Sequence, residues 1–296
     1  MTLCPVCRTE AVHHLALPHT EVVRCSSAHC GLQFALKQLE DKELSQAYRS
    51  FYYPSNGQAP RLQFPSTPTG VLRQMFRQLQ NRMPPFEGLR LLDYGCGLGS
   101  LLVVAREFGF TPEGIEQDPV ACHEASATVG NRIYRSIDDL SRHDPAARFD
   151  LVTVWNVIEH LREPWADLQQ LRRLLRPGGS LLVTTMNVHC VRARLEGSKW
   201  ENYANPTHFY YFDRRSLQRL IRHAGFGSVK EWKPHLRHPH HGTMRTLFYD
   251  VSNYIGVSGV VFYLSGVESS SATAHPAAIA GQKGASSSIE VGNSGK

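Results

Sequence analysis

The most informative stretch of this 296-residue chain reads Arg90-Leu-Leu-Asp-Tyr-Gly-Cys-Gly-Leu-Gly-Ser100. An apolar strand that carries Asp93 opens directly into three alternating glycines, Gly95, Gly97 and Gly99. Glycine lets the backbone turn sharply and approach a ligand without a Cβ between them, and the apolar residues that follow predict a helix whose N-terminus faces that ligand. The pattern predicts a nucleotide-like ligand at the end of a strand. A tight turn that binds nothing is the alternative.

The spacing of the glycines narrows the class of ligand. Dinucleotide-binding folds use G-x-G-x-x-G and place a pyrophosphate at the helix N-terminus. Here an acid, Asp93, stands on the strand itself, where it would repel phosphate and suit an ammonium group. The run resembles motif I of class I S-adenosylmethionine-dependent methyltransferases. That resemblance implies that Asp93 acts near the methionine moiety and that Gly95, Cys96 and Gly97 contact the cofactor.

A second acidic position supports a nucleotide-like ligand. Glu116 stands at the end of the next predicted strand, about 20 residues past the glycines, where a ribose-binding carboxylate belongs. Its oxygens can accept hydrogen bonds from both ribose hydroxyls, and Gln117 can contact the adenine. A solvated loop acid is the alternative for Glu116. Residues 133–139 predict a third strand running into a loop, in which Ile137 and Asp138 flank the adenine by resemblance.

Strands and helices alternate between residues 90 and 185. Residues 149–155 form an apolar run typical of a strand buried on both faces of a parallel sheet. Residues 163–176 carry leucines at helical spacing, Pro177-Gly178-Gly179 stops that helix, and residues 180–185 predict the next strand. This order predicts an α/β fold, a Rossmann-like, doubly wound and mostly parallel sheet with right-handed crossovers.

Three strings make the resemblance specific: Phe149-Asp-Leu-Val-Thr-Val-Trp-Asn-Val-Ile-Glu-His-Leu161, Leu174-Leu-Arg-Pro-Gly-Gly179 and Asn205-Pro-Thr-His-Phe-Tyr-Tyr-Phe212. Over most of residues 1–235 the chain resembles a bacterial branch of small-molecule class I methyltransferases, whose members often carry an N-terminal zinc ribbon. The resemblance implies S-adenosyl-L-methionine as cofactor and a small-molecule or glycan-precursor acceptor, with a hydroxyl favoured over an amine or carbon. The implied cofactor-binding residues are Asp93, Gly95, Cys96, Gly97, Glu116, Gln117, Ile137, Asp138 and Asn156.

The cysteines near the N-terminus show the spacing of zinc ligands. Cys4 and Cys7 form a C-x-x-C turn, and Cys25 and Cys30 form a second knuckle after a hairpin-length insert. Such a pair of knuckles predicts a tetrahedral, structural Zn2+ site. The second knuckle is longer than usual, so His29 could replace a cysteine, although four cysteines are favoured. The alternatives are disulfides, which a reducing cytosol disfavours, and a redox C-x-x-C, which lacks its βαβ context.

Two histidines are the candidate catalytic residues. His160 follows the fourth predicted strand, where cofactor and acceptor meet, and His208 lies in a loop after the fifth. The near-neutral pKa of histidine qualifies either as a general base, which is needed only if the acceptor must lose a proton. His208 is the first choice because aromatic residues surround it in the sequence. The alternatives are a structural hydrogen bond for His160 and a packing role for His208.

The chain divides into four predicted parts. Residues 1–36 form the zinc ribbon, 37–85 a helical and aromatic connector or lid with a helix over 69–82, 86–268 the methyltransferase domain, and 269–296 a disordered Ser-, Ala- and Gly-rich tail. Late in the domain, residues 259–264 predict a strand beside residues 227–232. Tyr48, Phe51, Tyr52 and Tyr53 form the aromatic cluster of the connector.

Composition predicts a soluble, cytoplasmic protein. The chain is 42% apolar and 20% charged, enough for one substantial core. No signal peptide and no membrane span are predicted, because the longest apolar run, residues 255–267, is shorter than the ~20 residues that a membrane helix needs. The oligomeric state is open.

The formal charge of +6 raises an alternative acceptor. A zinc ribbon ahead of a methyltransferase domain also resembles ribosomal RNA methyltransferases, in which the ribbon helps to grip RNA. The arginines of residues 213–224 follow the solvated face of an amphipathic helix instead, with Leu217, Leu220 and Ile221 turned inward, so nucleic acid is the less favoured partner. A non-catalytic cofactor-binding protein is the third hypothesis.

Overall fold

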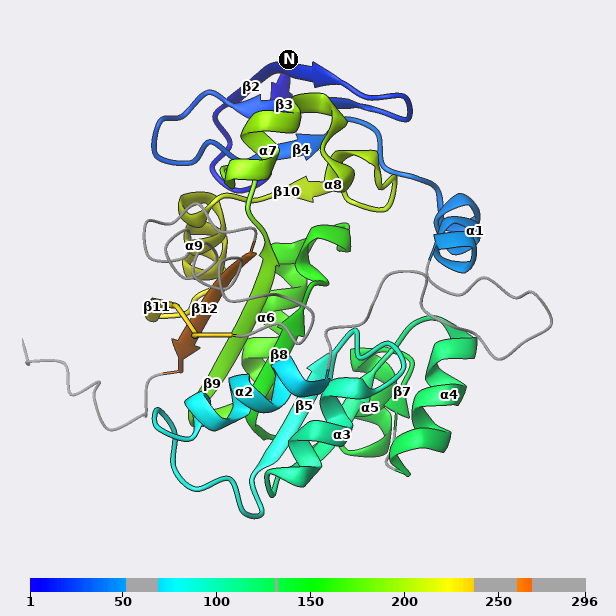
Figure 1. Ribbon diagram of the computed structural model, residues 1–296, viewed down its shortest axis with the longest axis vertical. Coiled ribbons are helices and arrows are strands. Elements are labelled where there is room, and N and C mark those ends of the chain that lie inside the picture. Colours follow the sequence, from blue (N-terminus) through cyan, green and yellow to red (C-terminus); the bar gives the residue numbers. More distant parts are fainter. Residues whose placement is uncertain (52–68, 131–132, 237–259, 268–296) are drawn as a thin grey trace, which may run out of the picture.

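The computed structural model describes residues 1–51, 69–130, 133–236 and 260–267. Its main body is a seven-stranded sheet in the order β11-β12-β9-β8-β5-β6-β7 (Figure 1). Neighbours from β9 to β7 pair in parallel, and β12 pairs antiparallel with both β9 and β11. The strands are β5 (Arg90–Tyr94), β6 (Thr111–Ile115), β7 (Ile133–Tyr134), β8 (Phe149–Trp155), β9 (Leu175–Met186), β11 (Ser228–Trp232) and β12 (Val260–Gly266). The predicted parallel α/β sheet is present. The predicted late strand pairs with residues 228–232 as expected, and the structure shows that this pairing is antiparallel.

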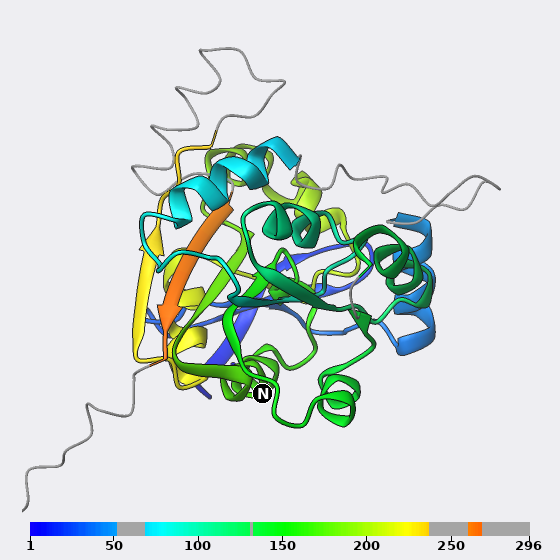
Figure 2. The same cartoon turned by 90° about the horizontal axis from the view of Figure 1, so that it is seen from below.

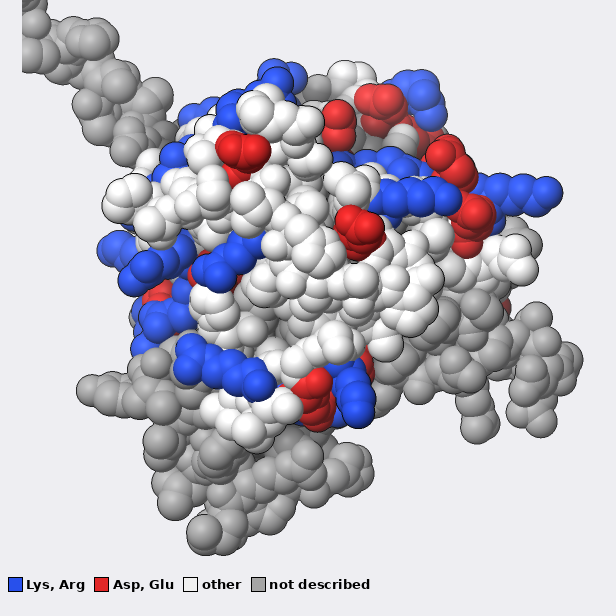
Figure 3. All heavy atoms as spheres, turned by 90° about the horizontal axis from the view of Figure 1, so that it is seen from above, with Lys and Arg blue, Asp and Glu red and all other residues white. Residues whose placement is uncertain are grey.

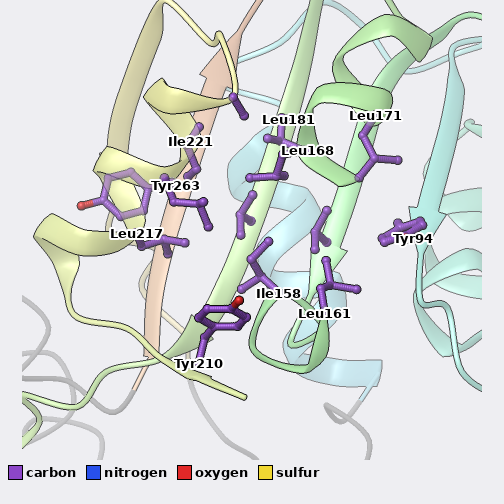
Figure 4. Packing of buried hydrophobic residues seen from close by; sticks show 14 of the residues in the cluster. Tyr94, Ile158, Leu161, Leu168, Leu171, Leu181, Tyr210, Leu217, Ile221 and Tyr263 are labelled. Atoms are coloured by element: carbon purple, nitrogen blue, oxygen red, sulfur yellow. The ribbon is translucent and has the colours of Figure 1, made fainter. Parts of the chain in front are cut away.

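Helices cover the two faces of this sheet (Figures 1 and 2). One face packs against α2 and α3 around Phe76, Phe86 and Leu102, and the other against α6 and α9. Figure 4 shows Leu168 and Ile221 of these last two helices in one buried cluster together with Leu181 of β9. The helices of the sheet region are α2 (Thr69–Leu79), α3 (Ser100–Glu107), α4 (Pro119–Val129), α5 (Ile137–His143), η1 (Ile158–His160), α6 (Pro164–Leu174) and α9 (Arg214–His223).

The N-terminal residues form a second, antiparallel sheet in the order β1-β2-β3-β4-β10, drawn at the top of Figure 1. Its strands are β1 (Thr2–Leu3), β2 (Glu10–Ala16), β3 (Glu21–Cys25), β4 (Gln33–Ala35) and β10 (Tyr210–Tyr211). The last strand comes from the far end of the chain, with Tyr211 opposite Gln33. Three short helices lie beside it, α7 (Val191–Glu196), η2 (Gly197–Lys199) and α8 (Glu201–Ala204). The ribbon is therefore built into the fold and shares one core with the large sheet.

Three local predictions need correction. The connector contains a helix, α1 (Asp41–Phe51), ahead of the predicted one, and the loop expected after the third strand is the helix α5. The Pro177-Gly178-Gly179 segment does not separate helix from strand, because α6 ends at Leu174 and β9 begins at Leu175. An irregular register, in which Leu175 and Ser180 pair with Phe149 and Leu151, accommodates the segment inside β9.

The described residues settle some further expectations. The inward face of α9 is confirmed, with Leu217, Leu220 and Ile221 fully buried. Within these residues no helix is long and apolar enough to cross a membrane. Tyr52, Tyr53 and the tail 269–296 lie outside the described part of the chain.

Candidate active site

The glycine turn is fixed against the end of β6. The backbone N–H groups of Gly95 and Cys96 both donate to the Ile115 carbonyl, at 2.8 and 3.0 Å. Gly95, Gly97 and Gly99 have φ values of 78°, 54° and 81°, in the left-handed region that glycine adopts without strain. A Cβ on Gly95 would lie 2.5 Å from a methyl carbon of Val157. The turn therefore lies directly against the segment that follows β8.

Glu116 spans this turn with its carboxylate. One oxygen accepts the N–H of Gly97 at 2.9 Å, and the other accepts the N–H of Asp118 at 2.9 Å. Burial raises the pKa of the Glu116 carboxyl, and the hydrogen bonds from Asp118 and Gly97 oppose that shift. A carboxylate offers about four acceptor positions, so two remain for a ligand's hydroxyls. Gln117 next to it has an exposed side chain.

Asp93 lies inside the sheet edge, only 2% exposed. The Thr153 hydroxyl of the neighbouring strand donates to its carboxylate at 2.6 Å. Burial raises the pKa of Asp93 to about 7, the hydrogen bond from Thr153 lowers it, and the charge of Glu116 raises it further. Two carboxyl groups next to the glycine turn favour a cationic ligand over a phosphate, because a nearby cation stabilises their charged form.

The remaining predicted cofactor residues line the same edge. Ile137, half-buried, and Asp138, exposed, open helix α5 rather than a loop, because the Ser136 hydroxyl accepts the N–H of Asp139 at 3.0 Å and caps the helix. Asn156 follows β8 with φ of 52°, a left-handed conformation that asparagine tolerates better than most residues. Its N–H donates to the Thr184 carbonyl at 3.1 Å. The Asn156 side chain is exposed, and its amide oxygen accepts the Thr184 hydroxyl at 3.2 Å.

The structure brings the two predicted histidines together. Their rings are 4.6 Å apart between centroids and lie edge to face. Glu159 completes a group in which one ligand atom from each of Glu159, His160 and His208 lies within 4.8 Å of the other two. We call these three residues the Glu–His–His cluster. Glu159 was missed as a site residue, although it stands in the string that carried the resemblance.

Burial determines the protonation of this cluster. It raises the pKa of Glu159 to about 7 and lowers that of His160 to about 4. Burial also lowers the pKa of His208 well below its usual value, and the neighbouring His160 lowers it further. Both imidazoles are therefore neutral near pH 7, which makes them weak bases and good ligands. Among the three, Glu159 titrates closest to neutral pH.

Aromatic residues hold the His208 loop in place. Trp200, Tyr203, Phe209 and Tyr210 are all nearly fully buried. The Phe209 carbonyl accepts the N–H of Ala35 of the ribbon at 2.8 Å, and the Phe209 N–H donates to the Glu159 carbonyl at 2.8 Å. On the connector, the ring of Tyr48 lies 5.9 Å from that of His160. The ribbon, the loop and the Glu–His–His cluster are thus joined by direct backbone hydrogen bonds.

The four N-terminal cysteines converge on one point. Their sulfurs lie within 4.8 Å of one another, with Cys4 to Cys30 at 3.8 Å and Cys7 to Cys25 at 3.3 Å. A tetrahedral zinc with Zn–S bonds of ~2.3 Å separates its sulfurs by about 3.8 Å, whereas a disulfide bond is only ~2.05 Å long. All four are free thiols, and His29 is exposed and outside the group. The arrangement suits a closed metal site, and no disulfide joins these four cysteines in the structure.

Fold and site together define a class I methyltransferase architecture, with a glycine turn and an acidic strand end at the carboxyl edge of a parallel sheet. A family model described as a methyltransferase domain matches residues 70–231, more than half of the chain. The chain therefore belongs to this family of methyltransferase domains.

Individual relatives match over shorter lengths. The chain is 34% identical over 155 residues to a ubiquinone biosynthesis O-methyltransferase of Cereibacter sphaeroides, covering 49% of this chain and 63% of that protein. It is 35% identical over 119 residues to a protein of the same name from Caulobacter, covering 38% of this chain and 46% of that one. The chain thus spans less than two thirds of the length of these relatives.

Solved structures give more distant matches. A methyltransferase from Mesorhizobium loti matches with a TM-score of 0.48 and 18% identity, over 65% of this chain and 97% of that one. One from Archaeoglobus fulgidus matches with a TM-score of 0.47 and 16% identity, over 66% and 94%.

Proposed function

We propose that the protein transfers a methyl group from S-adenosylmethionine to a hydroxyl of a small-molecule or glycan-precursor acceptor. The observation that carries the proposal is the Glu116 carboxylate, which bridges the amides of Gly97 and Asp118 at the carboxyl edge of the sheet. Its free acceptor positions suit the two ribose hydroxyls of a nucleoside. The names of the relatives, ubiquinone biosynthesis O-methyltransferases, support a hydroxyl as the acceptor.

The cofactor cradle follows from this geometry. The turn of Gly95, Cys96 and Gly97 brings backbone against the cofactor, and Asp93 supplies negative charge for its methionine ammonium group. Gln117, Ile137 and Asp138 are assigned to the adenine and Asn156 to the methionine side, next to the acceptor. These assignments rest on the position of each residue along one sheet edge and on the resemblance.

The Glu–His–His cluster is assigned to the acceptor. Methyl transfer breaks the C–S bond of the donor as the acceptor oxygen forms its bond to the methyl carbon, and the acceptor hydroxyl gives up its proton. The donor supplies an already activated methyl group, so much of the rate comes from alignment and removal of water. His208 and His160 orient the acceptor hydroxyl, and Glu159, with a pKa of about 7, suits a proton acceptor near neutral pH.

The four cysteines are proposed to hold one structural Zn2+. All ligands are protein thiols and the set is complete at four, which is the pattern of sites that stabilise a fold. Because β4 pairs with β10, the metal would stabilise the sheet that holds the strand next to His208. It fixes the ribbon edge against which the His208 loop lies.

The surface gives the RNA alternative little support. Figure 3 shows the ribbon end of the molecule, where basic and acidic side chains surround a broad uncharged area and the basic ones are more numerous on one side. Several arginines there are paired with acids, as Arg192 is with Glu196 and Glu201, both at 2.6 Å. A protein that grips RNA through phosphates needs a basic patch of one sign.

The affinity for S-adenosylmethionine is expected to depend on pH through Asp93. The carboxyl must be ionised to attract the ammonium group, and its pKa of about 7 means that it is protonated and neutral at lower pH. The affinity for S-adenosylmethionine should therefore rise about tenfold between about pH 6 and about pH 8, and it should fall further below about pH 6. Calorimetry at a series of pH values measures this. Asp93→Asn should remove the Asp93 contribution, and an identical profile in both proteins would contradict the assignment.

The acceptor class is tested with donor labelled in its methyl group. Pairs of acceptors that differ only in a hydroxyl or an amine, such as phenol and aniline derivatives or sugars and amino sugars, separate the two chemistries. We expect label in hydroxyl compounds and none in ribosomal RNA. Label only in amines would overturn the hydroxyl assignment, and salt-sensitive labelling of RNA would establish the RNA alternative instead.

A further inference from the structure

Buried polar atoms without partners gather around His208. Within the described residues, Glu159 Oε2, the Tyr211 hydroxyl and His19 Nε2 are buried and have no hydrogen-bond partner. Glu159 is 3% exposed. The Tyr211 ring lies 6.4 Å from the His208 ring, and the charge of a protonated His19 acts on His208. A buried polar atom without a hydrogen bond lowers the stability of a folded protein, so these three atoms indicate that an additional group binds here.

The two imidazoles are oriented as metal ligands usually are. His208 Nδ1 lies 2.8 Å from the Asn202 carbonyl, and His160 Nδ1 lies 3.0 Å from the Thr207 carbonyl. A carbonyl only accepts, so His208 Nδ1 carries a proton. The Thr207 hydroxyl also lies 3.0 Å from His160 Nδ1, but it donates to Asn205 Oδ1 at 2.8 Å, so we assign the proton of His160 to Nδ1 as well. Each Nε2 atom then has a lone pair. A hydrogen bond from one ring nitrogen to a backbone carbonyl is the usual support of a histidine that binds metal through the other nitrogen.

We propose that Glu159, His160 and His208 form a second metal site, which binds one divalent cation and presents it to the acceptor hydroxyl. Two imidazoles and one carboxylate make a ligand set suited to zinc, manganese, cobalt or iron. Three protein ligands leave coordination positions open, as in catalytic sites. The Asn205 amide lies 3.1 Å from His208 Nε2, and binding of the cation there exchanges this hydrogen bond for a metal bond.

The position of the site connects it with methyl transfer. The cluster begins two residues after Val157, whose side chain packs on Gly95 of the glycine turn. The strand that leads to it, β8, pairs with β5, which carries Asp93. His160 is partly exposed, whereas Glu159 and His208 are buried. The cation therefore lies at the same sheet edge as the methyl donor.

This inference rests on the proposed function and specifies its acceptor half. A bound divalent cation lowers the pKa of a hydroxyl that coordinates it. With the cation bound, Glu159 acts as its ligand in place of the proton acceptor. The hydroxyl proton then leaves to solvent, the oxygen lone pair forms the bond to the methyl carbon, and the electrons of the broken C–S bond stay on sulfur. A hydroxyl acceptor with a second oxygen beside it would chelate the cation and be preferred over an isolated hydroxyl.

Metal counting tests the site directly. The full chain is dialysed against micromolar Zn2+, and bound zinc is measured by mass spectrometry. We expect two zinc ions per chain in the unaltered protein and one in Glu159→Gln and in His208→Gln, with the ribbon still loaded. His189→Gln, which changes a half-exposed histidine outside the cluster, is the matched control and should keep two. One zinc per chain in the unaltered protein, or two in both cluster variants, would overturn the proposal.

Two further measurements distinguish loss of the metal site from misfolding of a variant. Cobalt added to unaltered protein in which only the cysteine site holds zinc should give a visible spectrum without the thiolate bands of a cysteine site, and absence of any such spectrum contradicts the site. Glu159→Gln should bind S-adenosylmethionine within threefold of the unaltered affinity while its turnover on a hydroxyl acceptor falls at least tenfold. If the unaltered protein binds two metals but no S-adenosylmethionine, the proposed function fails and the metal site stands.

Discussion

Glu116→Ala is expected to reduce the affinity for S-adenosylmethionine at least 100-fold. The substitution removes the carboxylate that we assign to the ribose hydroxyls, and each hydrogen bond to a charged group contributes about 1.5–3 kcal/mol, so the loss of two amounts to more than 100-fold in Kd. Calorimetric titration of the variant measures it. Gly97→Arg, which places a long side chain on a backbone with φ of 54°, is expected to abolish binding as well.

The control for these variants is Glu107→Ala. Glu107 lies at the other end of α3 and pairs on the surface with Arg73 at 2.7 Å, far from the glycine turn. Its loss should leave cofactor affinity unchanged. Because Glu116 also holds two backbone amides, thermal unfolding of Glu116→Ala must be recorded together with binding. Unchanged affinity in both Glu116→Ala and Gly97→Arg would refute the cradle.

Loss of a ribbon thiol is expected to have the second large effect. Cys25→Ser should release the structural zinc, and structural zinc sites supply on the order of 10 kcal/mol to the folding of small zinc domains. The ribbon edge pairs with β10, and the Phe209 backbone links Ala35 of the ribbon to Glu159. We therefore expect Cys25→Ser to lower the melting temperature and to lower turnover more than cofactor affinity.

Zinc stoichiometry, thermal unfolding and turnover are measured side by side on Cys25→Ser. Cys122→Ser is the matched control, because Cys122 lies on α4 and outside the thiol group. It should keep its zinc and its stability. Full stability and turnover in Cys25→Ser would show that the ribbon is dispensable to the enzyme.

The sheet was predictable because its determinants are local. Residues 90–185 alternate apolar strands with amphipathic helices, and the structure pairs these strands in parallel as that order requires. The continuous apolar run of residues 149–155 is a buried strand. The spacing of the cysteines likewise predicted their convergence, since two short knuckles can reach one point only by folding together.

The features that the sequence did not reveal depend on contacts between distant residues. Nothing near Tyr211 indicates that it pairs with Gln33 of the ribbon, and nothing near His208 indicates that Glu159 lies beside it. The helix α1 was not predicted, although Asp41 and Glu43 in its first turn favour a helix start. The raised pKa of Glu159 follows from burial, which the sequence pattern alone did not show.

The most direct test of the central claim is a calorimetric titration of the unaltered chain with S-adenosylmethionine. We predict saturation at one molecule per chain with a Kd in the micromolar range, and competition by S-adenosylhomocysteine for the same site. No saturable heat at millimolar cofactor, with the protein folded and its zinc in place, would contradict it.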